Sequence, residues 1–495
     1  MDQLFNRKPH TKYTKAYWHK LVSTGIYRLQ TGQDLFGIPS LKKQIQKDPH
    51  FASDKIATEH IDELLSKLSI DDESILRVVA GIKGNSSDSN ESQGNLVENS
   101  TQQKRQEQQQ RKEKMDTLFA ELENSIPDKR FTDYIVKIIQ KKVKRDIPLI
   151  KQILYTGLSA YQRDPINLGI VSPASEGKTY GVMEVLEGFP KEDIIKIGSM
   201  TPKVLIRERG IHVDMNNHPL RDRIFQLEKQ IKIAKKKKKD DLVEKLTNDL
   251  RDLYDNSRYY IDLRNKILVF LERPDESILD ILMPILSHDS FEIEHPYVFS
   301  IDNQGMAVKK ILTVGWPAFI FCSAKDESEW ERWSEIESRC IITSPSMVKQ
   351  KYGESITLSS QNKTLPKKLQ QRLVRSDDQV ELAKKCILYT KLTIQDANSF
   401  EIRPWSPFGW ILSEIMQAKE GRDMRVGNRI FNLLNIIAIA KLHLRMTIQL
   451  SDSDGLETSV IADVEDLKEV YSITQHITGM QLRKLREFID VFCPA

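Results

Sequence analysis

One eight-residue segment of the sequence has the residue types and the spacing of a phosphate-binding loop. It follows a short apolar run and precedes a helical pattern, and it consists of Ser172, Pro173, Ala174, Ser175, Glu176, Gly177, Lys178 and Thr179. The segment matches G-x-x-x-x-G-K-[ST] except at the first position, where serine replaces glycine. In such loops backbone N–H groups surround phosphate oxygens, the lysine pairs with the β- and γ-phosphates, and the threonine hydroxyl binds Mg²⁺. The alternative is an ordinary helix N-cap turn.

A carboxylate stands at the end of a second apolar run. Glu272 follows the run that begins at Ile267, where it could polarise a water molecule that attacks a phosphate. The preceding residue is Leu271 and not the Asp that often binds the metal in such motifs. We therefore expect Mg²⁺ to be held by Thr179 and water, or by another acid such as Asp275. Taken alone, the segment is more simply a buried strand that meets a solvated turn.

Two more polar residues accompany apolar strands further along the chain. Ser323 lies near the end of a run that begins at Ala318, and its hydroxyl could hold the attacking water or the γ-phosphate. Arg339 precedes an apolar strand and follows an amphipathic helix, which suits a guanidinium that reaches the nucleotide of a neighbouring subunit. The alternative for Arg339 is a surface ion pair with Glu335 or Glu337.

The elements that must position these residues follow from the apolar pattern. Three short apolar runs suit buried parallel strands, and they are residues Ile166–Ser172, Lys266–Glu272 and Pro317–Ser323. Helical patterns lie between them, and one begins near Tyr180. The sequence therefore predicts an α/β domain with a parallel sheet, which we place at residues 115–365.

An insertion within this domain has a different character. The segment Leu220–Tyr254 combines helical apolar spacing with a heavily charged surface, which predicts a projecting helical hairpin or coiled coil. Its lysine run, Lys235–Lys239, could touch a phosphate backbone, although such runs are more often a solvated tip.

The flanking regions differ from this core. Residues 1–82 predict a helical accessory domain, with a winged-helix or helix-turn-helix nucleic-acid module as the alternative. Residues 83–114 contain few apolar side chains and predict a disordered linker. An amphipathic basic helical segment follows at Phe131–Tyr161. Residues 366–495 predict a helical lid and C-terminal domain, with one buried helix at 428–446.

The composition excludes several classes of protein. The chain has 495 residues with 74 Lys and Arg against 70 Asp and Glu, which argues against a polybasic nucleic-acid coat. The four cysteines have neither disulfide-framework nor zinc-site spacing, and they favour a reducing compartment. The polar start of the chain and the absence of a long apolar stretch argue against a secretory signal and a membrane span. We expect a cytoplasmic protein.

The order of these motifs resembles an AAA+ P-loop ATPase module, in particular the minichromosome-maintenance and phage primase–helicase-like branch. The resemblance covers about residues 153–478. It implies that ATP and Mg²⁺ bind at Lys178 and Thr179, that Glu272 is the catalytic base, and that Ser323 is the first sensor. It also implies that Arg339 is a finger acting in trans within a homo-oligomer, a hexameric ring. Arg425 is our choice for the second sensor, which would also bind nucleotide, and Arg429 is its rival.

The resemblance implies a function in which ATP hydrolysis drives DNA remodelling, in a helicase-like manner, in replication or in the maintenance of a mobile element. In helicase relatives the loops between core strands enter the central pore, so residues 289–297 or the lysine-rich hairpin are expected to contact DNA. One alternative is an AAA+ protein-remodelling chaperone. Another is a nucleotide-sensing regulator with slow hydrolysis, which the absence of an Asp at Leu271 favours.

Overall fold

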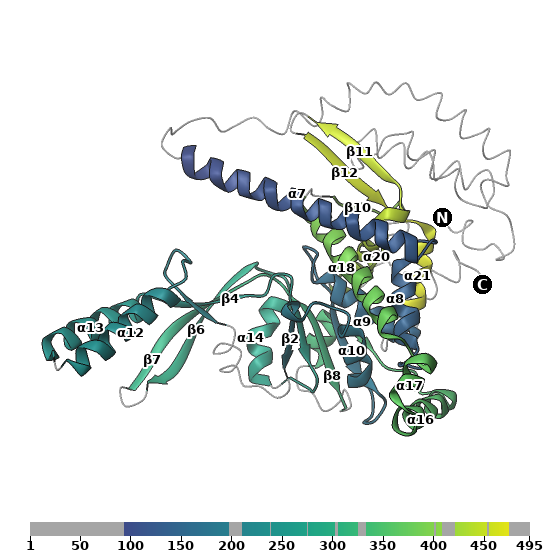
Figure 1. Ribbon diagram of the computed structural model, residues 1–495, viewed down its shortest axis with the longest axis horizontal. Coiled ribbons are helices and arrows are strands. Elements are labelled where there is room, and N and C mark those ends of the chain that lie inside the picture. Colours follow the sequence, from purple (N-terminus) through teal and green to yellow (C-terminus); the bar gives the residue numbers. More distant parts are fainter. Residues whose placement is uncertain are drawn as a thin grey trace.

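The computed structural model describes residues 94–197, 210–237, 239–274, 276–301, 305–324, 333–399, 402–407, 421–452 and 455–474 (Figure 1). The predicted accessory domain at residues 1–82 lies outside these ranges. At the centre is a sheet of five parallel strands in the order β2-β5-β8-β1-β9. The strands are β1 (Asn167–Val171), β2 (Ile194–Ile197), β5 (Ile267–Phe270), β8 (Ala318–Ser323) and β9 (Ile341–Thr343). The predicted α/β class and all three predicted strands are confirmed.

Alternate residues of each central strand face opposite sides of the sheet, and two hydrophobic cores result. Leu168 and Ile170 of β1 belong to one core, and Leu268 and Phe270 of β5 belong to the other. Gly169 is required between them, because a Cβ there would lie 2.5 Å from the Phe321 ring. The continuous apolar runs seen in the sequence reflect this burial on both faces.

Helices cover both faces of the sheet. The helices whose residues join the first core are α8 (Phe131–Gln140), α9 (Ile147–Ser159), α10 (Lys178–Leu186), α18 (Asp377–Ser399), α20 (Gly421–Ala440) and α21 (Val464–Thr474). The second core contains residues of α14 (Glu276–Leu286) and α15 (Trp333–Arg339). Short 3-10 turns complete this part, η1 at Lys191–Asp193 and η3 at Leu442–Leu444. The central sheet is thus buried between two helical layers.

The predicted disordered linker is corrected over part of its length. Helix α7 (Gly94–Ser125) runs through residues 94–114 and across the expected domain boundary at 115 (Figure 1). Few apolar residues do not prevent a helix here, because the segment is rich in Gln, Glu, Lys and Arg, which favour helices. Its C-terminal half also packs on the first core through Leu118, Phe119 and Leu122. Low apolar content therefore does not predict disorder by itself, because helix propensity also counts.

A second sheet, which the sequence did not indicate, carries the predicted insertion. Its four strands have the order β3-β4-β7-β6, and they are β3 (Ile211–Val213), β4 (Arg258–Asp262), β6 (Glu292–Ile301) and β7 (Gly305–Val314). Between β3 and β4 the chain forms two antiparallel helices, α12 (Arg221–Lys236) and α13 (Asp240–Asp255). The predicted helical hairpin is confirmed, and it projects beside β6 and β7 at the left of Figure 1.

The C-terminal region contains strands as well as helices, whereas the sequence predicts helices alone. It contains α17 (Lys367–Leu373) as well as α18, α20 and α21, and α16 (Lys349–Thr364) comes just before it. It also contains a small sheet in the order β10-β12-β11, formed by β10 (Pro404–Trp405), β11 (Thr447–Asp452) and β12 (Gly455–Ile461). The period-2 pattern of Thr447–Ile461 is short and polar, so it was missed beside the strongly apolar α20. The buried helix predicted at 428–446 is confirmed up to Ala440.

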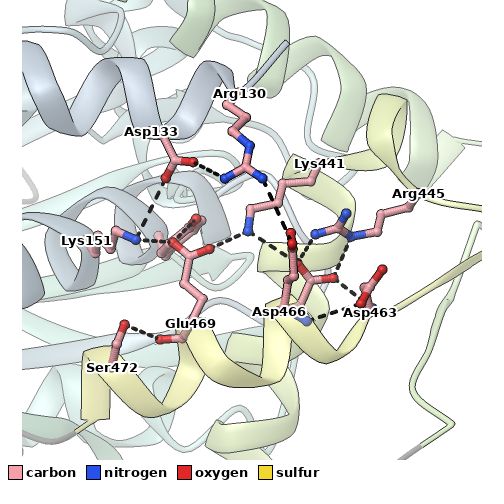
Figure 2. Close-up of polar contacts among 11 residues, drawn as sticks. Arg130, Asp133, Lys151, Lys441, Arg445, Asp463, Asp466, Glu469 and Ser472 are labelled. Atoms are coloured by element: carbon pink, nitrogen blue, oxygen red, sulfur yellow. Dashed lines mark hydrogen bonds and ion pairs between the residues drawn. The ribbon is translucent and has the colours of Figure 1, made fainter. Parts of the chain in front are cut away.

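A buried network of ion pairs fixes α21 to the helices around it (Figure 2). Glu469 is 8% exposed and pairs with Lys441 and, at 2.7 Å, with Lys151 of α9. It also accepts a hydrogen bond of 2.9 Å from the fully buried hydroxyl of Tyr155. Asp466, 0% exposed, pairs with Lys441 and Arg445. Since α9 leads directly into β1, the network joins the end of the described chain to the central sheet. No helix in the described ranges is long and apolar enough to cross a membrane.

Candidate functional site

The loop from Ser172 to Gly177 connects β1 to α10 at the carboxyl edge of the central sheet. Helix α10 begins at Lys178, two residues before the predicted start. Gly177 is its N-cap and has a left-handed backbone, with φ of +84°. Ser175 also has a positive φ, +68°, which is uncommon outside glycine and marks a constrained loop. The sequence pattern therefore has the strand–loop–helix context that a phosphate-binding loop requires.

Lys178 folds back over this loop. Its Nζ donates hydrogen bonds of 2.6 Å to the backbone oxygens of both Ser172 and Pro173. The side chain is 7% exposed, and burial lowers the pKa of its ammonium group. In the described part of the chain no salt bridge to this ammonium is found, so its closest partners are neutral carbonyls. A phosphate group would supply the negative charge that this buried cation lacks. The adjoining N-terminus of α10 also favours a negative charge.

Thr179 lies against the buried thiol of Cys322 on β8. Burial raises the pKa of Cys322 to about 11, although Lys178 and a hydrogen bond with Thr179 act in the opposite direction. The thiol is therefore protonated at neutral pH. The Thr179 hydroxyl is an oxygen donor of the type that Mg²⁺ prefers. Among the described residues no group of three His, Cys, Asp or Glu side chains is arranged to hold a metal ion.

Ser323 and Glu272 lie at the same edge of the sheet as the loop. Ser323 is paired in register with Val171, and its carbonyl accepts a hydrogen bond of 3.2 Å from Ser172 N. Phe270 is paired with Phe321, so Glu272 follows β5 at the level where Ser323 ends β8. Ser323 is buried and Glu272 is exposed. Three of the predicted elements therefore converge where the carboxyl ends of parallel strands meet, the usual ligand position in such sheets.

Leu271 explains why the site lacks a second carboxylate next to Glu272. Its side chain packs against the first hydrophobic core, so the position between β5 and Glu272 carries no carboxylate. Asp275, the proposed substitute, lies outside the described residues. The donors that could hold Mg²⁺ near the loop are thus the Thr179 hydroxyl and Glu272, together with phosphate oxygens of a bound nucleotide.

A support for the loop comes from α16, which the sequence did not indicate. Lys351 is 7% exposed, pairs with Asp146 at 2.6 Å, and donates a hydrogen bond of 3.1 Å to the Glu176 carbonyl. The Tyr352 hydroxyl donates to the Glu176 carboxylate at 2.9 Å. These residues are far apart in sequence and belong to no motif, so only the fold brings them together. In the sequence, Lys351 is only a lysine near the start of a polar helix, which does not indicate a role at the loop.

Arg339 lies at the opposite edge of the sheet. Its carbonyl accepts a hydrogen bond of 3.2 Å from Asn167, the first residue of β1, whereas the loop follows the last residue. The strand between them is roughly 16 Å long at about 3.3 Å per residue. Its guanidinium donates to the Glu335 carbonyl at 3.1 Å, and its buried Nε has no partner among the described residues. The structure does not bring Arg339 to the loop of its own chain.

Arg425 and Arg429 of α20 lie near Arg339 and away from the loop. Arg425 donates to the Ser338 hydroxyl at 3.0 Å, and Arg429 donates to the Cys340 carbonyl at 2.8 Å. Burial lowers the pKa of Arg429 to about 10. The structure therefore does not bring Arg425 beside Lys178 of its own chain. Three arginines instead gather at the edge opposite to the loop.

No protein-family model matches this chain, and no curated protein matches it.

Proposed function

We propose that the protein is an oligomeric AAA+ ATPase that couples ATP hydrolysis to DNA remodelling. The observation that carries the proposal is the buried Lys178 ammonium, held by two loop carbonyls and the Ser172 hydroxyl at the carboxyl edge of a parallel sheet. A nucleotide phosphate would supply the negative charge that this group lacks. Ser323 and Glu272, from two neighbouring strands, end at the same edge.

Each residue then has a defined task. On binding, Lys178 exchanges the carbonyls of Ser172 and Pro173 for phosphate oxygens, and the N–H groups at the start of α10 hold the same phosphates. Bound Mg²⁺, held by Thr179, would neutralise charge that develops on the phosphates. Glu272 accepts a proton from the attacking water, and the Ser323 hydroxyl orients that water.

The separation of Arg339 from Lys178 supports the proposed ring. A guanidinium at the opposite edge of the sheet serves catalysis only when another copy places its loop against it. Arg425 beside Ser338 lies on the same side, so we assign the proposed second sensor to the same neighbouring nucleotide. In this arrangement each site draws residues from two copies of the chain.

The proposed DNA contact is the β6–β7 hairpin, which contains most of the region expected from sequence. Its two ten-residue strands extend away from the central sheet (Figure 1). The basic segment after α8 is a weaker candidate, because Lys142 pairs with Glu184 at 3.0 Å and Arg145 pairs with Glu354 at 2.7 Å. Charges that are already paired contribute little to phosphate binding.

The decisive experiment measures nucleotide binding and ATP turnover in matched variants. Lys178→Ala is expected to abolish binding, Glu272→Gln to bind ATP without hydrolysis, and the control Lys191→Ala, at an exposed lysine, to leave both unchanged. Equal turnover in Glu272→Gln and the unmodified protein would remove Glu272 from the mechanism. Turnover is then measured with single-stranded DNA, duplex DNA and unfolded protein, and stimulation by unfolded protein alone would favour the chaperone alternative.

The position of Leu271 supports a second candidate, a nucleotide-sensing regulator with slow hydrolysis. Its side chain packs in the core where a metal-binding carboxylate would otherwise stand. Tight ATP binding with turnover that neither DNA nor unfolded protein stimulates would favour this candidate over the motor.

A further inference from the structure

The helical hairpin α12–α13, here called the arm, has the apolar pattern of a two-stranded coiled coil. Seam residues recur with spacings of three, four and three in both helices: Ile224, Leu227, Ile231 and Ala234 in α12, and Val243, Leu246, Leu250 and Leu253 in α13. This is the a/d spacing by which two helices pack along one seam. The arm is thus an independently patterned element, about 24 Å long at 1.5 Å per residue.

The two helices of the arm carry opposite charge. Helix α12 has six basic and two acidic residues, a net charge of +4: Arg221, Arg223, Lys229, Lys232, Lys235 and Lys236 against Asp222 and Glu228. Helix α13 has six acidic and two basic residues, a net charge of −4: Asp240, Asp241, Glu244, Asp249, Asp252 and Asp255 against Lys245 and Arg251. The arm as a whole therefore has one positive and one negative side.

These charges are not used within the arm. Every charged side chain in both helices is exposed, and within the described ranges none of them forms a salt bridge. Opposite charges placed on adjacent helices without pairing each other leave both sides available to an external partner. That partner must itself offer a negative surface to α12 and a positive surface to α13.

Apolar side chains also remain uncovered on the arm. Phe225 is 67% exposed, Ile233 45% and Leu242 42%, and all three stand outside the seam. Helix α13 has no buried residue, so even its seam positions keep part of their surface in water. Further burial of these side chains would be favourable at about 25 cal/mol per Å².

We propose that the arm is an assembly element that binds the arm of a second copy of this chain, with α12 of one copy against α13 of the other. A second copy supplies both required surfaces at once, because it carries the same +4 and −4 helices. The contact would complete a four-helix arrangement over the exposed apolar side chains. A nucleic acid fits less well, because phosphates would be repelled by α13 and by Asp240 and Asp241 next to the lysine tip.

The test exchanges charge between the two helices. One variant carries Lys229→Glu, Lys232→Glu and Lys236→Glu, and the other carries Glu244→Lys, Asp252→Lys and Asp255→Lys, all at exposed positions outside the seam. Self-association of full-length protein without nucleotide is measured by sedimentation velocity. Each variant alone is expected to self-associate at least tenfold more weakly than the unmodified chain, and their equimolar mixture is expected to associate as the unmodified chain does.

Three results would overturn the proposal. Either variant could associate normally, or the mixture could remain dissociated. The third is that the variant with Lys229→Glu, Lys232→Glu and Lys236→Glu loses only its affinity for duplex DNA. The unmodified chain gives a test that needs no variant. Its association should weaken at least tenfold between 0.1 and 1 M salt, because salt screens exposed charges, and salt-insensitive association would contradict the proposal. Lys178→Ala should associate normally, so a failure of the proposed ATPase activity is separable from a failure of the arm contact.

Discussion

Replacing Glu469 with glutamine is expected to lower the free energy of unfolding by about 3 kcal/mol at neutral pH. Burial alone would raise the pKa of this carboxyl, but the charges of Lys441 and Lys151 more than offset it and lower the pKa from 4.5 to about 2. At about 1.4 kcal/mol per pKa unit, this difference corresponds to about 3 kcal/mol. The value agrees with the roughly 3–5 kcal/mol lost when one partner of a buried ion pair is removed.

The effect has a defined pH dependence. Because the pKa of Glu469 is lower in the folded protein than in the unfolded chain, its contribution is complete above pH 4.5 and is lost as the pH falls toward 2. The variant has no carboxyl at this position and lacks that contribution at every pH. The difference in stability between the two proteins should therefore be largest at neutral pH and should shrink steadily below pH 4.5.

Urea unfolding followed by far-UV circular dichroism, at several pH values, measures this difference. Glu123→Gln is the matched control, since it removes an ion pair of 2.5 Å between Glu123 and Lys129 in which both side chains are at least 35% exposed. Its cost should stay within about 1 kcal/mol. Equal costs in the two variants, or a Glu469 effect that grows toward low pH, would refute the assignment of stability to the buried network.

Two further predictions concern the central sheet and its loop. Gly169→Ala should destabilise the protein by about 1–3 kcal/mol in the same unfolding assay, because its Cβ would lie 2.5 Å from a neighbouring ring. Gly353→Ala, in a helix with open space around it, should instead be neutral or stabilising by up to about 1 kcal/mol. Lys351→Met should cost about 3 kcal/mol by leaving Asp146 buried and unpaired, and should raise the KM for ATP. Lys349→Met, at an exposed position, should change neither, and an unaltered KM in Lys351→Met would show that α16 does not support the loop.

The sequence predicted the local parts of the fold well, because their patterns are local. The runs around Ile170, Val269 and Ile320 are apolar on both sides of the strand, which only a covered parallel sheet explains. The arm was equally clear, since Leu246 and Leu250 repeat at coiled-coil spacing. Helix α7 was missed because its side chains are polar, although they favour the helical backbone.

The candidate site was predicted only where one segment of chain makes it. The loop with Lys178 and the strand ends with Glu272 and Ser323 follow from motif and strand direction alone. The support from Lys351 did not, because it depends on how a helix packs against a loop residue 175 positions earlier in the chain. The location of Arg425 could not be predicted from the sequence either. Its distance along the chain from the loop does not indicate which edge of the sheet it faces.

The connections between the two sheets have a mechanical consequence. Strand β4 passes into β5 through Leu263–Lys266, and β7 passes into β8 through Gly315–Pro317. Gly315 N donates to the Phe291 carbonyl at 2.9 Å, which holds the second connection against the residue that precedes β6. Two short covalent attachments remove the rotation that a single linker would allow. The direction in which the arm points is therefore set by β5 and β8, the same two strands whose other ends carry Glu272 and Ser323. A pair of fluorophores on the arm and on α18 would thus report any nucleotide-dependent shift of those strands as a change in energy transfer.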